Sequence, residues 1–294
     1  MIHIDKEKCK ACGICGIICP RHIPETLKKG DQKTTVLSEE RIHLCMECGH
    51  CVAVCPNFAI HVDKLSGENF DSIPEINLTE NQLLNLMKHR RSVRRYKDKP
   101  VPRDVLNRIL EATHLAPTGT SNRATGVIVI DTPEMLNTLS ERFYTLYSDL
   151  EKALKNPIAR FIIKRRVGKE TVSTLQNFVM PGMHWYIKWY TSGQSNEILR
   201  DCPVLILFYS PVFEPMASEN CLIAAFHTVL MAEVLGVGTC FNDLIPPVCN
   251  RDAEIKKILS LPEGCEVYAS ITAGYPKYKF QRTIPRRLAE VRYL

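Results

Sequence analysis

The sequence predicts an α+β protein of two unequal domains: a small cysteine-rich one, then a larger one with a mixed sheet. Three observations lead to this prediction. Eight cysteines form an internal repeat within residues 9–55. Residues 66–78 are polar and rich in turn formers, which is typical of an interdomain linker. From residue 79 to 294, helical and strand patterns alternate irregularly, which favours an α+β layer over a regular parallel sheet.

The composition limits the function classes. The chain has 294 residues and 45% apolar content, enough for a sizeable core. Basic residues outnumber acidic ones by six but are scattered outside residues 89–95, so we expect no nucleic-acid partner. No apolar stretch approaches the roughly 18 residues of a membrane span, and the N-terminus carries charges where a secretory signal is apolar. We therefore expect a cytoplasmic protein with no membrane partner. Its 13 cysteines then indicate ligand or redox roles rather than disulfides.

The cysteine spacing indicates iron–sulfur chemistry in the first domain. The pattern Cys-x2-Cys-x2-Cys-x3-Cys-Pro begins at Cys9 and recurs 36 residues later at Cys45. Two-residue gaps let a short loop present three thiolates to three irons, while the fourth cysteine, held before a proline, points away. A pair of zinc sites is the alternative, but zinc needs four ligands and does not require the doubled pattern.

This pattern resembles the bacterial-type dicluster ferredoxins over residues 1–65. The resemblance implies two [4Fe–4S] clusters with crossed ligation. One cluster would take Cys9, Cys12, Cys15 and Cys55, and the other Cys45, Cys48, Cys51 and Cys19. Apolar residues 2–4 and 59–62 predict two paired strands that close the fold. The 25 residues between Cys19 and Cys45 are highly charged and predict a solvated loop or helix, which is a candidate docking surface.

The second domain, predicted to span residues 79–294, starts with a helix. Thr79 and Gln82 have capping-box spacing, and the helix ends at the basic run of residues 89–95. Further apolar patterns predict strands at residues 126–130, 204–209 and 267–273. They also predict an amphipathic helix around residues 106–113 and a helix at 136–150. Residues 219–235 are apolar nearly all round, which predicts a helix that is fully buried or at an interface.

The basic run carries a second resemblance, to the nitroreductase family of FMN enzymes, which extends from about residue 80 to the C-terminus. Residues 90–96 (RRSVRRY) resemble the Arg-rich entry motif of that family. The resemblance implies that Arg90, Arg91, Ser92 and Arg94 bind the FMN phosphate and ribityl chain. Forked guanidinium groups suit a phosphate dianion. From the residues alone, a solvated basic helix end that complements the helix dipole stays an alternative.

Three further motifs follow in the order of that family. Residues 116–122 (APTGTSN) resemble the loop that reaches the flavin ring, which implies contacts from Pro117, Thr118 and Asn122. Residues 235–241 (LGVGTCF) resemble the segment before the flavin N5 contact, which implies the backbone amides of Asp243 and Leu244. Residues 273–276 (AGYP), followed by Arg286 and Arg287, resemble a strand end and a second phosphate-binding pair. Taken singly, these are common turn elements and surface arginines.

The two resemblances together predict an FMN-dependent oxidoreductase. Electrons would pass from the two clusters to FMN, which would reduce an electron-poor small molecule of nitro or quinone type. The chemistry would occur on FMN, so no catalytic side chain is predicted. An electron-transfer module serving a protein partner, or another FMN reduction such as dehalogenation, stays open. The donor would be a low-potential protein or NAD(P)H, and the family resemblance implies a homodimer.

Two further groups of residues stand outside these motifs. Residues 184–190 hold an aromatic group that either roofs a flavin pocket or belongs to the core or an interface. The remaining cysteines lack ligand spacing and are expected as small buried hydrophobes: Cys202, Cys221, Cys240, Cys249 and Cys265.

Overall fold

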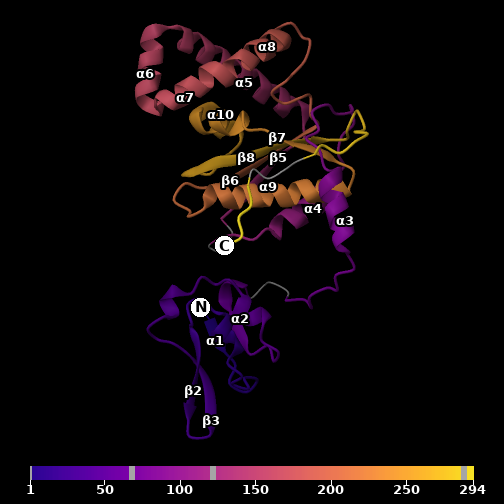
Figure 1. Cartoon of the computed structure of the whole chain (residues 1–294). Helices are drawn as coiled ribbons and strands as arrows, with labels where there is room; N and C mark the ends of the chain where they lie inside the picture. Colours follow the sequence, from indigo (N-terminus) through magenta and orange to yellow (C-terminus); the bar gives the residue numbers. More distant parts are fainter. Residues whose placement is uncertain (1, 66–69, 120–123, 286–289) are drawn as a thin grey trace. The chain divides into compact units, whose positions relative to one another are not determined.

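A computed structural model describes residues 2–65, 70–119, 124–285 and 290–294 (Figure 1). The chain forms two compact units. The N-terminal unit comprises Met1–Asn77 and Thr118–Arg123, and the C-terminal unit comprises Leu78–Pro117 and Ala124–Leu294. The domain limits expected from the sequence, at residues 65 and 79, stay a prediction, because part of the linker lies outside the described residues.

The N-terminal unit is closed by the predicted pair of strands. Strand β1 (Ile2–Ile4) pairs antiparallel with β4 (Ile60–Val62). Two short helices, α1 (Ile14–Ile18) and α2 (His50–Ala53), and two 3-10 turns, η1 (Ile42–Leu44) and η2 (Asp63–Leu65), complete the cysteine-rich part. The buried core of this unit is small and consists of Ile2, Cys15, Cys51, Val52, Ile60, Val62 and Leu65.

The 36-residue sequence repeat is also a repeat of backbone conformation. Three positions in each half have a positive φ, and each value matches its counterpart in the other half within a few degrees. The matched pairs are Ala11 (51°) with Glu47 (50°), Gly13 (79°) with Gly49 (80°), and His22 (49°) with Phe58 (51°). Because non-glycine residues seldom adopt this region, the two halves share one backbone path.

The charged stretch between the two cysteine motifs is a β-hairpin, so the expected solvated loop or helix is wrong. Strand β2 (Pro24–Lys29) pairs antiparallel with β3 (Gln32–Leu37). Gly30, with a φ of 62°, begins the two-residue turn. Thr34, Thr35 and Val36 are β-branched and favour a strand, a signal hidden among the exposed charges.

The C-terminal unit contains a four-stranded sheet in the order β5-β6-β8-β7. Its strands are β5 (Gly126–Ile130), β6 (Val204–Pro211), β7 (Gly238–Phe241) and β8 (Cys265–Gly274), and each neighbouring pair is antiparallel. A single parallel bridge, between Ser92 and Thr239, adds the basic segment to the β7 edge. The three strands predicted in this unit are confirmed.

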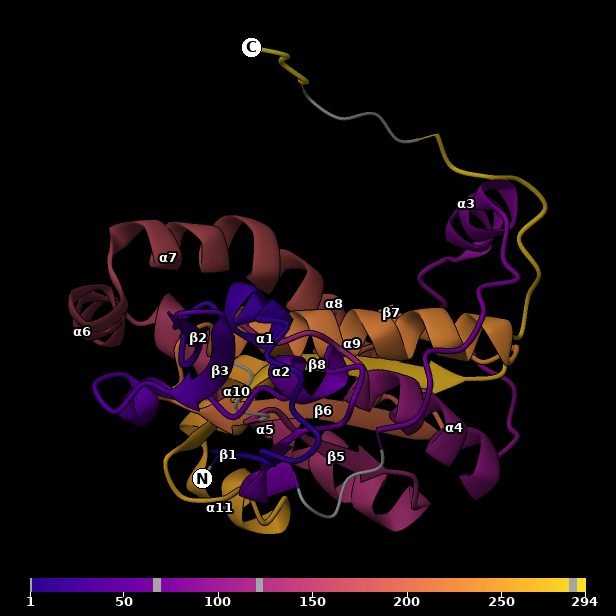
Figure 2. The same ribbon diagram turned by 90° about the horizontal axis from the view of Figure 1, so that it is seen from below.

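Helices cover both faces of this sheet (Figure 1). One face packs on α4 (Arg103–His114) and α9 (Ala217–Val234), with α3 (Glu80–His89) against α9. Figure 2 shows α9 lying along the strands. The remaining helices are α5 (Pro133–Lys155), α6 (Pro157–Val167), α7 (Lys169–Thr174), the π turn η3 (Leu175–Val179), α8 (Met180–Thr191), α10 (Ile245–Arg251) and α11 (Ala253–Ile258).

Strand β6 explains why the unit has two cores. Its side chains alternate, so Ile206 and Phe208 join the α4 and α9 core while Leu205 and Leu207 join the core with α5, α8 and α10. The predicted capping box of α3 is present, with Thr79 accepting from the Gln82 amide at 3.3 Å. The sequence thus predicts both the start of this unit and its central strand.

Four other expectations concern burial, exposed surfaces and membrane spans. The five cysteines of the C-terminal unit are all buried, as expected for small hydrophobes. In the aromatic group, Tyr190 stacks on Tyr144 at 3.8 Å between ring centroids, whereas Trp185 is 49% exposed. Helix α9 is not buried all round, because Leu222 and Phe226 are exposed. Among the described helices, none is long and apolar enough to cross a membrane.

Candidate cluster and flavin sites

The first group of thiols gathers in one pocket of the N-terminal unit. Cys9, Cys12 and Cys15 line it from the first repeat, and Cys55 comes from the second. Burial raises the pKa of Cys15, and the neighbouring Cys12 and Cys55 sulfurs raise it further. We call this the first cluster pocket. The structure thus brings together the four cysteines that the crossed pattern assigns to one cluster.

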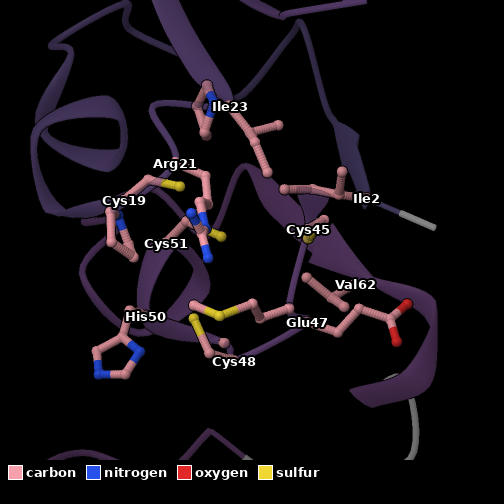
Figure 3. Close-up of a pocket in the computed structure, with 14 residues that line it drawn as sticks. Ile2, Cys19, Arg21, Ile23, Cys45, Glu47, Cys48, His50, Cys51 and Val62 are labelled. Atoms are coloured by element: carbon pink, nitrogen blue, oxygen red, sulfur yellow. The ribbon is translucent and has the colours of Figure 1, made fainter. Parts of the chain in front are cut away.

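The second group of thiols mirrors the first. Cys45, Cys48 and Cys51 line a second pocket together with Cys19 from the first repeat (Figure 3). Burial raises the pKa of Cys51 to about 11, and the three other sulfurs raise it further. We call this the second cluster pocket. Four clustered thiolates require nearby positive charge, which the iron atoms of a [4Fe–4S] cluster supply, so this donor set fits the group.

The two pockets differ in the charged and polar residues beside the thiols, none of which was predicted from the sequence as a site residue. Lys10 and Asn57 line the first pocket. Arg21, Glu47 and His50 line the second, and Figure 3 shows the Arg21 side chain pointing into the ring of sulfurs. The repeat offset is the signal that could have found them, because Arg21 and Asn57 are equivalent positions.

In the C-terminal unit, three of the four flavin motifs converge. The Val93 amide donates to the Thr239 carbonyl at 2.9 Å, which ties the Arg-rich segment to β7. The Lys97 amide donates to the Tyr275 carbonyl at 2.8 Å, which ties the same segment to the chain after β8. A Cβ at Gly238 would lie 2.6 Å from a Val93 methyl, so this approach needs glycine.

The conformation of the Arg-rich segment is fixed by Tyr96. Its buried hydroxyl donates to the Val93 carbonyl at 2.7 Å and lies 2.9 Å from the Thr272 hydroxyl. Burial raises the Tyr96 pKa well above its ordinary value, so the hydroxyl stays a neutral donor. The tyrosine of the motif therefore joins the segment to β8.

Some arginines of this segment already bind groups of the protein, whereas others do not. Glu197 neutralises Arg95 through two contacts of 2.6 and 3.1 Å. The Arg91 guanidinium donates to the carbonyls of Lys88 (2.6 Å) and Arg90 (2.7 Å), but its buried Nε has no hydrogen-bond partner among the described residues. Arg90 and Arg94 make no ion pair within the described ranges.

The same region contains a second unsatisfied polar atom. The Thr239 hydroxyl, beside Ser92 in the parallel bridge, is buried and has no hydrogen-bond partner in the described part of the chain. Buried polar groups are normally satisfied, so two unsatisfied polar atoms, one on Thr239 and one on the residue that precedes its bridge partner Ser92, indicate a polar ligand. Together with the available charges, this fits an anionic group such as the FMN phosphate. Thr239 is not among the site residues predicted from the sequence, although it lies inside the Leu235–Phe241 motif.

The two predicted backbone donors after β7 differ. The Leu244 amide already donates to the Asn242 side chain at 3.2 Å, and Asn242 is held by the Ile198 carbonyl at 2.6 Å. Asp243 is exposed, and its amide makes no hydrogen bond within the described residues. Of the two predicted donors, the Asp243 amide is therefore the one free to meet a ligand.

Of the remaining predicted flavin residues, the structure describes only Pro117 and Thr118. Pro117 is exposed in the C-terminal unit, whereas Thr118 groups with the N-terminal unit. Asn122, Arg286 and Arg287 lie outside the described residues. The roles of these five residues stay a prediction.

Both parts of the chain match models of known protein families. The model of the nitroreductase family matches residues 87–275, and that of the 4Fe-4S dicluster domain matches residues 1–56. An NADH dehydrogenase of Thermus thermophilus is 26% identical over 64% of this chain and 83% of its own length. Ketoisovalerate oxidoreductase subunit VorC of Methanothermobacter marburgensis is 30% identical over 23% of this chain and 90% of its own length.

A solved structure supports the fold assignment of the larger unit. A nitroreductase of Bacteroides fragilis with bound FMN superposes with a TM-score of 0.54 and 22% identity, over 73% of this chain and 98% of that one. The nitroreductase family model covers more than half of the sequence. The chain therefore belongs to the nitroreductase family of oxidoreductases and carries a 4Fe-4S dicluster domain at its N-terminal side.

Proposed function

We propose that this protein is an iron–sulfur flavoprotein that passes electrons from two [4Fe–4S] clusters to FMN and so reduces an electron-poor small molecule, of nitro or quinone type. The main observation in support of this proposal is that one chain contains both two groups of four thiols and a nitroreductase-family unit. Clusters carry one electron each, whereas FMN accepts one or two. The flavin would therefore convert one-electron supply into two-electron chemistry.

The proposed cluster ligands are the two crossed sets of cysteines. Cys9, Cys12, Cys15 and Cys55 would hold the first cluster, and Cys19, Cys45, Cys48 and Cys51 the second. The grouping of these sulfurs in two pockets supports the proposal. Buried surroundings and backbone donors would then set the potentials of the clusters.

The proposed FMN contacts begin with the Arg-rich segment. Arg90 and Arg94 would supply charge to the phosphate. Arg91 and Ser92 would orient it, because the Arg91 Nε and the Thr239 hydroxyl both lack a hydrogen-bond partner among the residues that the structure describes. The Asp243 amide would face the flavin ring, in preference to that of Leu244. The earlier predictions for Pro117, Thr118, Asn122, Arg286 and Arg287 are retained as part of this proposal.

The assembly and location are further parts of the proposal. We infer a homodimer, since exposed Leu222, Ile223 and Phe226 leave an apolar strip on α9 that a second copy would cover. We also infer a cytoplasmic protein, because eight reduced thiols are needed for the clusters.

The test is anaerobic reduction followed by absorbance of clusters and flavin. The protein is mixed with a reduced low-potential ferredoxin and, separately, with NADPH. We expect the ferredoxin to reduce FMN, Cys12→Ala to abolish that reduction, and Arg90→Ala to release FMN while the clusters still reduce. FMN reduction by NADPH that is unaffected by Cys12→Ala would reverse the proposed direction of flow and refute the proposal.

Two alternatives are separated by the oxidation step. Reduced protein is offered a nitroaromatic, a quinone and a halogenated phenol in turn. Flavin reoxidation by the first two supports the proposal, and selective halide release would assign dehalogenation instead. A reduced flavin that none of these oxidises, but that a protein acceptor does, would identify an electron-transfer module.

A further inference from the structure

The hairpin of the N-terminal unit carries two lysines that face each other. Lys28 of β2 lies directly opposite Lys33 of β3, and both are exposed. Like charges at directly opposite positions of an antiparallel pair destabilise it. Neither lysine makes an ion pair within the described residues, and the turn carboxylate of Asp31 is not paired with them. Because the two lysines weaken the hairpin that carries them, their positive charge is better explained by a role in binding than by a role in stability.

The lysine pair continues the face of the hairpin that meets the first cluster pocket. Residues two apart on a strand point to the same side, so Lys28 and Lys33 share a face with Thr26 and Thr35. The hydroxyls of these threonines lie 3.0 Å apart. Thr35 lines the first cluster pocket, and the Thr26 hydroxyl is 3.3 Å from where a Cβ of Gly13 would stand.

The first cluster pocket also has the more exposed thiol. Of the eight cluster cysteines, all of them described, Cys12 alone is exposed. Lys10, two residues before it, lines the same pocket, is exposed and has no ion pair among the described residues. Lys10 therefore lies in the same pocket as the exposed thiol, and Lys28 and Lys33 lie further along the hairpin face that meets this pocket.

Exposed apolar side chains complete this surface. Ile14, which lines the first pocket, is 41% exposed, and Phe58, three residues after Cys55, is 62% exposed. Phe58 has a φ of 51°, a conformation that bulky residues seldom adopt. An apolar centre with charged residues around it is the usual composition of a protein interface.

We propose that Lys10, Lys28 and Lys33 form a docking surface for a small acidic one-electron carrier protein, which delivers its electron to the first cluster. The proposal rests on the function proposed above and assigns its entry point. One electron leaves the reduced carrier and reduces the first cluster from the 2+ to the 1+ state, with no bond formed or broken and no proton transferred. Charge complementarity favours a carrier with carboxylates around its own redox centre.

The test measures cluster bleaching by anaerobic stopped flow, with a reduced acidic bacterial ferredoxin as the probe. Lys28→Gln/Lys33→Gln removes the facing pair. Lys29→Gln is the matched control, because Lys29 lies on the opposite face of the same hairpin, opposite Gln32. Lys10→Gln tests the surface without altering the hairpin.

At low ionic strength we expect the double variant to react about tenfold more slowly than the unmodified protein, and Lys10→Gln several-fold more slowly, since steering by local charge changes association rates by roughly 10–10³. The unmodified rate should fall with added salt, and that of the double variant should fall less. Lys29→Gln should stay within about twofold of the unmodified rate. Reduced methyl viologen, a small cation, should reduce the two hairpin variants no more slowly than the unmodified protein.

Equal rates for the unmodified protein, the double variant and Lys10→Gln would overturn the proposal. If Lys29→Gln slowed cluster reduction as much as the double variant does, the proposal would also be overturned, because the net charge of the protein would then explain the rates. Salt-sensitive self-association that the lysine changes abolish would assign the surface to a second copy. The FMN signal distinguishes the failure of one proposal from the failure of the other. If the lysine changes slow cluster reduction but FMN stays oxidised, only the cluster-to-flavin route is refuted. If FMN is reduced at the same rate in every lysine variant, only the docking surface is refuted.

Discussion

The two cluster pockets share one backbone and differ in their charges. The left-handed positions repeat at an offset of 36 residues, so both halves build the same cage for four sulfurs. The first pocket has the exposed Cys12 and is lined by Lys10, whereas the second has a half-buried Cys48 at the equivalent position and is lined by Arg21. The repeat therefore fixes where clusters can sit, and single unrepeated side chains fix what each one does.

The largest expected effect comes from removing what both pockets share. The core of the N-terminal unit is small, so the clusters should supply much of its stability. Removal of iron by an anaerobic chelator should unfold this unit and leave the C-terminal sheet intact. Hydrogen exchange should show loss of protection in β1 and β4 but not in β6 and β8. Persisting protection in β1 and β4 would show that the fold does not depend on the clusters.

Crossed ligation predicts that neighbours in sequence affect different clusters. Cys19→Ala should remove or convert the second cluster, as Cys48→Ala does, while Cys15→Ala should affect the first. Each change should lower the iron content from about eight to about four per chain when the cluster is lost. The remaining cluster should give the same electron paramagnetic resonance spectrum in Cys19→Ala and Cys48→Ala. A Cys19→Ala spectrum that matches Cys15→Ala would mean that each half binds its own cluster.

The charge difference between the pockets predicts a difference in reduction potential. A cation near a cluster favours the reduced state, so Arg21→Gln should lower the potential of the second cluster. The reverse exchange at the equivalent position, Asn57→Arg, should raise that of the first. Both shifts should be on the order of tens of millivolts, because Arg21 is also exposed to solvent. Potentiometric titration followed by paramagnetic resonance measures both, and an unchanged second-cluster potential in Arg21→Gln would contradict the assignment.

The smallest expected effect concerns the hairpin itself. Lys28→Glu replaces two facing like charges with an opposite pair and should stabilise the hairpin by roughly 0.2–1 kcal/mol. Amide exchange in β2 and β3 should therefore slow, even as the variant accepts electrons from the acidic carrier more slowly. The control is Lys29→Glu, which faces Gln32 and should change neither quantity appreciably. Faster exchange in Lys28→Glu would show that the lysine pair does not strain the hairpin.

Patterns that involve several residues could be predicted from the sequence. Cysteine spacing gave both groups of thiols, and alternating or continuous apolar runs gave β1, β4, β5, β6 and β8. The hairpin was missed because its strands are charged and exposed, although Gly30-Asp31 between them is a turn signal. Arg21 and Thr239 were missed because a single side chain has no spacing to detect, and its environment is set by residues distant in sequence.

The Leu244 amide shows a different limit. Its engagement by Asn242 depends on a side-chain amide that donates to the Ile198 carbonyl, and on a backbone carbonyl of Asn242 that accepts from the Ser270 hydroxyl. A motif places a backbone amide near a ligand, but it does not show whether that amide already has a partner. The structure was needed to choose Asp243.

The exchange of one cysteine between the halves has a consequence for biosynthesis. A nascent chain that ends after Pro20 contains Cys9, Cys12 and Cys15 in one cage and Cys19 in the other, so it can complete neither. The second cage becomes complete when Cys51 has emerged from the ribosome, and the first only with Cys55. Cluster insertion must therefore wait until almost the whole domain has been synthesised. Until then the thiols of the first repeat carry no iron, and a reducing environment or a delivery protein must keep them from being oxidised.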